Sequence, residues 1–225
     1  MEEEKQIQPE EESKQFTTLD KYSQVLQNCQ LEEAREVCEG AVEEILQKKL
    51  QGDADVFEKL QALCEKVIAE GKGKELCDGI CKAASNHVTL KILDGLLNHL
   101  EDDKFVKTLN KAWEDFYFRA HEIGRVFEPL QEYCFDAKVE NPQARMVRAF
   151  RDEVVLSESV LAYAQEHLNK MIERCEGGEV SLRTEIRKSC FMLKTLDYGG
   201  EKPEKYRGKF EEGFLERCSE FYESS

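Results

Sequence analysis

The residues whose types and spacing come closest to a chemical site are two cysteines one helical turn apart. Cys77 and Cys81 are separated by four positions, and His87 follows further along the same stretch. Thiolate and imidazole are zinc ligands, but a zinc site usually needs four well-placed ligands, and no second Cys or His pair has a comparable spacing. We therefore interpret both thiols as part of a packed helix face and predict no metal site and no cofactor.

Other catalytic signatures are weak. Each of the four histidines falls on a separate predicted helix, and no sequence signature joins one to a serine or cysteine nucleophile: His87, His99, His121 and His167. Gly71-Lys72-Gly73 and Gly177-Gly178 lack the glycine patterns that hold phosphate, so we interpret them as turns. The sequence predicts that the chain is not an enzyme. An all-α enzyme whose catalytic groups meet only in space remains an open alternative.

Charge and composition restrict the partners. The 225 residues contain 32 Lys and Arg against 47 Asp and Glu, a formal net charge of −15. This charge repels phosphate and anionic lipid, so we expect no nucleic-acid partner and no membrane partner. Six glutamates and two lysines fall within the first fourteen residues, and we predict a disordered acidic tail over 1–15.

The expected cellular location rests on two targeting signals, a membrane helix and a signal peptide. No run of about 18 apolar residues suggests a membrane helix, and the acidic start does not resemble a signal peptide. We expect a cytoplasmic or nuclear protein. Its nine cysteines are spread along the chain without the compact spacing of a disulfide framework, so we interpret them as reduced thiols in the core.

Hydrophobic periodicity predicts an all-α fold. Apolar residues recur at intervals of three and four after Gln30, and the residues from 31 to 46 place one such stripe on a single helix face: Leu31, Ala34, Val37, Cys38, Ala41, Val42, Ile45 and Leu46. Short glycine-marked turns separate successive stripes, as in a helical bundle or a stack of helical repeats. Asn141-Pro142 interrupts the pattern, which suggests a boundary near 136–144.

Four blocks in order resemble the cullin family. They are Leu109–Asp115 with Trp113 followed by His121–Ile123 and Val126-Phe127; Val147–Val154; Gly178-Glu179 with Arg183, Arg187 and Met192-Leu193; and Tyr206, Phe210-Glu211, Phe214-Leu215 and Phe221-Tyr222. Trp113 alone also fits any helical protein, as an aromatic anchor of a helix interface. The resemblance covers roughly residues 30–225. It implies an elongated stack of cullin-type repeats, the first over 16–137 and the second, complete or incomplete, over 138–225.

Cullins are scaffolds of ubiquitin ligases, and the resemblance implies a function of that kind. The first repeat of a cullin holds an adaptor through its second and fifth helices, and the C-terminal half holds the RING subunit. The resemblance here stops near the end of a second repeat, so we expect no RING subunit. We expect a scaffold or regulator in ubiquitin-ligase assembly and ubiquitin-dependent protein degradation, such as an adaptor competitor without ligase activity. The alternative is a helical-repeat interaction module whose partners are unrelated to ubiquitin ligases.

The resemblance implies that residues on two helices of this chain correspond to the adaptor-binding positions of the family. They are Phe57, Leu60, Gln61, Cys64 and Glu65 on the second helix, and Ile123, Val126, Phe127 and Leu130 on the fifth. Gln61 and Glu65 stand where the family has tyrosines, and Glu128-Pro129 replaces an apolar and aromatic pair. A proline inside a helix costs about 3 kcal/mol, so we expect the helix to kink or end there. These departures predict a diverged interface.

Overall fold

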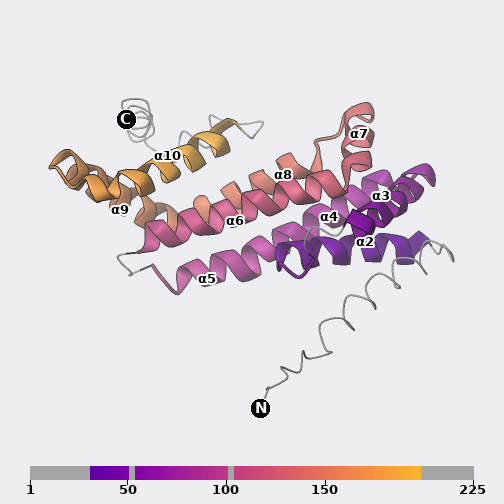
Figure 1. Ribbon diagram of the computed structural model, residues 1–225, viewed down its shortest axis with the longest axis horizontal. Helices are drawn as coiled ribbons and strands as arrows, with labels where there is room; N and C mark the ends of the chain where they lie inside the picture. Colours follow the sequence, from indigo (N-terminus) through magenta and orange to yellow (C-terminus); the bar gives the residue numbers. More distant parts are fainter. Residues whose placement is uncertain (1–30, 51–53, 101–103, 199–225) are drawn as a thin grey trace, which may run out of the picture.

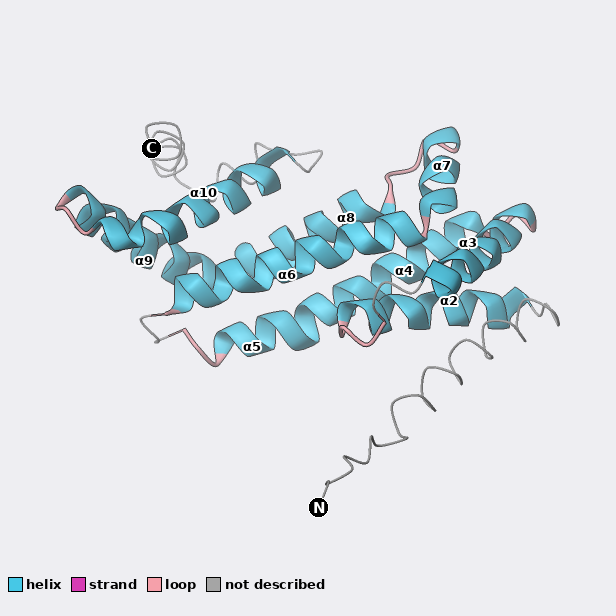
Figure 2. Cartoon of the chain, in the orientation of Figure 1, coloured by secondary structure: helices cyan, strands magenta, loops and turns pink. Residues whose placement is uncertain are grey.

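The computed structural model describes residues 31–50, 54–100 and 104–198, and every regular element in these ranges is a helix (Figure 2). In chain order they are α2 (Leu31–Leu46), α3 (Ala54–Ala69), α4 (Gly73–His87), η1 (Val88–Leu93), α5 (Asp94–Leu97), α6 (Phe105–Val126), α7 (Glu128–Asp136), α8 (Pro142–Ala149), η2 (Phe150–Val155), α9 (Glu158–Glu176), η3 (Val180–Leu182) and α10 (Arg183–Tyr198). The all-α prediction is confirmed. The predicted acidic tail and the aromatic residues from Tyr206 to Tyr222 lie outside the described ranges.

The helices form an elongated stack around α6 (Figure 1). The helices α3 and α7 lie at one end and α9 and α10 at the other, and α6 contacts members of both groups. The segments α4, η1 and α5 follow one another without a break, and along this line α4 contacts α8, η1 contacts η2 and α5 contacts α6. In the part of the chain that the structure describes, no helix is both long and apolar enough to cross a bilayer.

In the first described helix, α2, the residues of the predicted apolar stripe are the ones that pack in the core. Its buried residues are Ala34, Val37, Cys38, Ala41, Val42, Ile45 and Leu46, which is the predicted stripe without Leu31. This face packs on α3 and α4, while Glu32, Glu33, Glu36 and Glu43 are exposed. Burial of one continuous apolar face stabilises the helix where local propensity alone would not.

The predicted turns end helices as expected. After α3, Gly71 adopts a φ of 79°, which a side chain would strain. The Gly71 N–H donates to the oxygen of Ile68 at 2.9 Å, and the Lys72 N–H donates to that of Val67 at 3.1 Å. This pair of hydrogen bonds is a Schellman motif, and it satisfies carbonyls that the end of α3 would otherwise leave open.

Asn141-Pro142 begins a helix as well as ending a turn. The Asn141 side-chain oxygen accepts from the Ala144 N–H at 2.9 Å, and Pro142 occupies the first turn of α8, where a missing N–H does no harm. The predicted boundary therefore coincides with the connection between α7 and α8. The buried core continues across it, from Ala34 to Leu196, and the division into two repeats stays a prediction.

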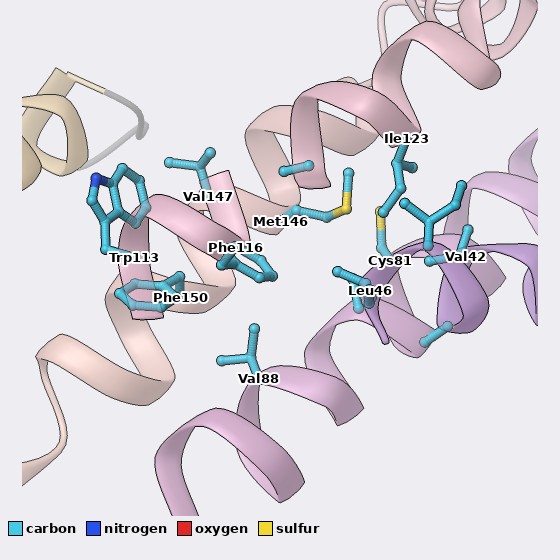
Figure 3. Close-up of a cluster of buried hydrophobic side chains, with 14 of the residues drawn as sticks. Val42, Leu46, Cys81, Val88, Trp113, Phe116, Ile123, Met146, Val147 and Phe150 are labelled. Carbon is cyan, nitrogen blue, oxygen red and sulfur yellow. The ribbon is translucent and has the colours of Figure 1, made fainter. Parts of the chain in front are cut away.

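Aromatic side chains join α6 to η2 in the middle of the stack (Figure 3). The Trp113 ring centroid lies 5.1 Å from that of Phe150, and the Phe116 ring stacks on Phe150 at 5.3 Å. Trp113 is only 2% exposed. Its interpretation as an aromatic anchor of a helix interface is confirmed.

Two π-helical segments, η1 and η2, lie against each other below these rings. Val88 and Val154 are fully buried in the contact. At its edge, the hydroxyls of Ser85 and Thr89 donate to the carboxylate of Glu153. Apolar packing and charge-assisted hydrogen bonds therefore both hold η1 and η2 together.

A buried polar network attaches α10 to α6. Asn110, 1% exposed, donates through its side-chain nitrogen to the main-chain oxygen and the carboxylate of Glu185, each at 3.0 Å. The Ser189 hydroxyl donates to the Asn110 side-chain oxygen at 2.7 Å. Every polar atom of the Asn110 amide thus has a partner, which makes its burial tolerable.

Candidate functional site

The two helices on which the site was predicted lie side by side, since α3 contacts both α6 and α7. Six of the nine predicted residues are at most 1% exposed: Leu60, Cys64, Ile123, Val126, Phe127 and Leu130. These six side chains belong to the continuous core and join α3 to α6 and α7. In this conformation they pack beneath the surface and support it, and they are not part of the surface itself.

The other three predicted residues do reach the surface. Phe57 packs partly against the core, Gln61 is half-buried and Glu65 is exposed. They are spaced by four residues on α3 and therefore form one line along its outer side. Any partner that docks on α3 meets these three side chains first.

The expected helix interruption is present at Pro129. The helix α6 ends at Val126, Phe127 has φ −105° and ψ 38°, and α7 begins at Glu128 with Pro129 in its first turn. The structure thereby confirms that the helix ends at this point. Proline costs little here because the first-turn N–H groups of a helix have no partner within it.

Side-chain amides from both flanking helices bind the carbonyls at the end of α6. Gln61 on α3 donates to the main-chain oxygen of Arg125 at 3.2 Å, and Gln131 on α7 donates to that of Gly124. Gly124 leaves space for this arrangement, because a Cβ there would lie 2.9 Å from the Gln131 side-chain nitrogen. The polar residue at position 61 therefore has a defined structural role.

A cleft of about 470 Å³ opens above these amides. It is lined by α3 and the α6–α7 junction through Ala54, Phe57, Glu58, Gln61, Gly124, Arg125, Glu128 and Gln131. Glu58, Glu128 and Arg125 are exposed around its rim. The cleft thus combines one aromatic wall, an amide floor and charged edges.

Phe135 extends this surface over α7 and was not among the predicted residues. It is 84% exposed, and it lines a second cleft of about 710 Å³ with Glu132, Asp136 and other residues of α7 and the following turn. Leu130 and Cys134 mark the buried side of α7. Since Phe135 lies one position off that stripe, the sequence did contain the signal that it faces outward.

We name the exposed and half-buried residues around the two clefts the α3–α7 surface. It comprises Phe57, Gln61, Glu65, Arg125, Gln131 and Phe135. The surrounding exposed carboxylates are Glu58, Glu128, Glu132 and Asp136. The chemistry of this surface is that of recognition, with two aromatic anchors in an acidic rim, and it brings together no nucleophile and base.

The cysteine pair considered for zinc lies on α4, where both thiols are buried. His87 is on the same helix and is half-buried, and burial lowers the pKa of its imidazole. Within the described residues, no group of three or more His, Cys, Asp or Glu side chains could hold a metal ion. The seven cysteines that the structure describes are all buried, as predicted for core thiols: Cys38, Cys64, Cys77, Cys81, Cys134, Cys175 and Cys190.

A separate apolar groove of about 470 Å³ lies between α6 and α10. Trp113 and Tyr117 are among the residues that line it, together with the exposed rings of Phe118 and Phe191, which are 58% and 49% exposed. This groove shares no lining residue with the α3–α7 surface, and its exposed rings therefore provide matched controls for tests of that surface.

Comparison with protein families gives one match over most of the chain. The model of the cullin alpha solenoid domain matches residues 35–225. The match begins within α2, and it includes α3, α6 and α7, which together form the α3–α7 surface.

Proposed function

The chain belongs to the cullin family, and we propose that it is a non-catalytic scaffold that binds an adaptor protein of ubiquitin-ligase assembly. Membership supports this because the alpha solenoid is a scaffold fold. The chemistry of the described surface agrees, since it offers anchors for a protein partner and no set of catalytic groups.

We propose the α3–α7 surface as the docking site. The observation that carries the proposal is the cleft lined by Phe57 and Gln61 from α3 and by Arg125 and Gln131 from the α6–α7 junction. The cullin resemblance implied adaptor binding by α3 and by the stretch that forms α6 and α7 here. The buried residues Leu60 and Ile123 support the surface as packing, and Phe57 and Phe135 provide its aromatic contacts.

Interface energy concentrates in a few aromatic and arginine residues surrounded by a polar rim. Phe135, with its side chain largely in solvent, would lose the most exposed apolar area on docking. The carboxylates of Glu58, Glu128 and Glu132 make the rim acidic. A complementary adaptor would therefore present an apolar pocket with basic residues around it.

Direct binding tests this proposal. The full chain is titrated against a panel of purified cullin adaptor subunits, and the variants Phe57→Ser and Phe135→Ser are compared with Phe191→Ser. Loss of an aromatic anchor costs about 2 kcal/mol, so we expect roughly 30-fold weaker binding for the first two variants and unchanged binding for the control. Equal affinity of Phe135→Ser and the unsubstituted chain for a bound adaptor would exclude the α3–α7 surface.

We further propose that the segment matched by the solenoid domain competes with other cullins for an adaptor, in the cytosol or nucleus. A reconstituted ligase provides the measurement. Adding the chain should slow substrate ubiquitination in proportion to its adaptor affinity, and the Phe57→Ser/Phe135→Ser double variant should not. Acceleration by the added chain would contradict competition.

A helical-repeat module with partners unrelated to ligases is the second candidate. The observation that favours it is the lining of the cleft, where Gln61 and Glu128 are polar at positions for which the resemblance implies aromatic or apolar residues, and Glu58 adds a further carboxylate. A folded chain that binds no adaptor of the panel would favour this candidate over the first.

A further inference from the structure

Three cysteines meet where α4 contacts α7, below a surface arginine. Cys77 and Cys81 come from α4 and Cys134 from α7. The Cys77 and Cys134 sulfurs are 3.8 Å apart, and both residues are 0% exposed. Arg145 of α8 places a guanidinium nitrogen 3.4 Å from the Cys77 sulfur. Helices separated in sequence thus bring two thiols and a fixed positive charge together.

The surroundings of the two facing thiols differ. Hydrogen bonds from Cys81 and Cys134, together with the charge of Arg145, lower the pKa of Cys77 to about 6 despite its burial. Burial and the neighbouring Cys77 raise the pKa of Cys134 to about 12. The surroundings therefore favour ionisation of Cys77 over that of Cys134. A thiol beside a positive charge and a second thiol is the arrangement of a redox pair, and here both sulfurs lie just below the surface side chains.

From the facing sulfurs and the adjacent guanidinium, we propose that Cys77 is a peroxide-sensitive thiol and that Cys134 is its resolving thiol, so that oxidation joins α4 to α7 through a Cys77–Cys134 disulfide.

The reaction proceeds in two balanced steps with a hydroperoxide as oxidant. The Cys77 thiolate attacks one oxygen of hydrogen peroxide, an S–O bond forms, the O–O bond breaks, and hydroxide leaves. Sulfur loses two electrons to the peroxide and becomes sulfenic acid. The Cys134 sulfur then attacks the oxidised sulfur of Cys77, an S–S bond forms, the S–O bond breaks, and water leaves with the Cys134 proton.

The oxidant reaches the pair past an ion pair at the surface. Arg145 donates to the carboxylate of Asp78 at 2.7 Å, and these side chains are 26% and 53% exposed. Because Asp78 is exposed and Arg145 only half-buried, a movement of these two side chains is the route that the inference requires for a molecule as small as peroxide. Closing the sulfur separation from 3.8 Å to the about 2.05 Å of a disulfide needs only a small approach of α7 to α4.

Peptide mapping of the full chain tests the inference. The reduced protein is treated with hydrogen peroxide, remaining thiols are alkylated, and the chain is digested with trypsin without reduction. Cleavage after Lys and Arg places Cys77 and Cys81 in peptide 75–82, Cys134 in peptide 126–138 and Cys64 in peptide 60–66. We expect peptides 75–82 and 126–138 to be linked, and dithiothreitol to separate them.

Single substitutions show which cysteine reacts with peroxide and which one resolves the sulfenic acid. The linkage should persist in Cys81→Ser and should vanish in Cys77→Ser. In Cys134→Ser, the sulfenic acid should accumulate on peptide 75–82. Arg145→Gln should slow the linkage by about tenfold or more, because the thiolate loses its positive neighbour. Cys175→Ser, a buried thiol on α9, should leave the rate unchanged.

Three results would overturn the inference. One is linkage that survives in Cys77→Ser, which would assign Cys81 as the reacting thiol. Another is linkage of peptide 126–138 to peptide 60–66, which would assign Cys64. The third is a folded unsubstituted chain in which Cys175 and Cys190 are oxidised before peptide 75–82. None of these depends on adaptor binding, so the proposed function stands or fails separately.

Discussion

The side-chain amide of Gln61 on α3 donates to the main-chain oxygen of Arg125, 3.2 Å away at the end of α6. In a continuous helix, that oxygen would accept from the N–H four residues later. Residue 129 is proline and has no N–H, so the helix cannot supply the bond. The side-chain donor at position 61 thus replaces the main-chain donor that is missing at position 129. Both residues are departures that the cullin resemblance pointed out.

Replacing Gln61 with methionine should therefore destabilise the chain. Methionine keeps the length of the side chain but removes the donor, and one lost side-chain hydrogen bond costs about 1 kcal/mol. Urea denaturation followed by circular dichroism measures the change. Gln61→Glu also lacks the donor and should lose at least as much, whereas unchanged stability in both variants would mean that water satisfies Arg125 equally well.

Asn110 should matter more than an exposed asparagine. Asn110→Ala removes the partner of both Glu185 and Ser189 in a buried network, so we expect a loss of about 1–3 kcal/mol. Asn98, exposed at the end of α5, donates through its side-chain nitrogen to the Asp94 oxygen of its own turn and is a matched control. Equal denaturation midpoints for Asn110→Ala and Asn98→Ala would contradict the role of the network.

The aromatic contact between α6 and η2 predicts a larger effect. Phe150 is 0% exposed and touches both Trp113 and Phe116, so Phe150→Ala should cost about 3–5 kcal/mol through lost burial and a cavity. Phe191→Ala on the exposed side of α10 should change stability by less than about 0.5 kcal/mol. Tryptophan fluorescence reports the first variant directly, because Trp113 is the only tryptophan. A small loss in Phe150→Ala would mean that Trp113 repacks.

Sequence periodicity was sufficient for the helices and for much of the core. The stripe of α2 gave seven of its buried residues, and the glycine and proline positions gave the turns at Gly71 and Asn141. Each of these depends on neighbours within a few residues. The same local rule correctly placed the end of a helix at Pro129, because proline acts on the turn in which it stands.

Contacts between distant segments could not be obtained in this way. A stripe identifies the buried side of one helix, but the helix that covers it depends on the whole fold. Cys134 was therefore not connected with Cys77, 57 positions earlier, and six of the predicted surface residues lie in the core between α3, α6 and α7. Phe135 was missed for another reason, since aromatic residues are usually assumed to be buried.

The buried thiols predict how stability depends on pH. Burial raises the pKa of Cys38 and Cys64, the latter to about 12 from an ordinary value of 9.0. Above pH 9 the unfolded chain loses these protons while the folded chain keeps them, so stability should fall as pH rises from about 9 toward 12. Unfolding free energies measured across this window should decline less steeply in Cys64→Ala than in the unsubstituted chain, whatever the cavity costs at neutral pH. Cys77 acts in the opposite direction, because its pKa is lowered to about 6, and its contribution grows between pH 6 and 9. Identical slopes above pH 9 for Cys64→Ala and the unsubstituted chain would show that the Cys64 thiol ionises in the folded protein as readily as in the unfolded one.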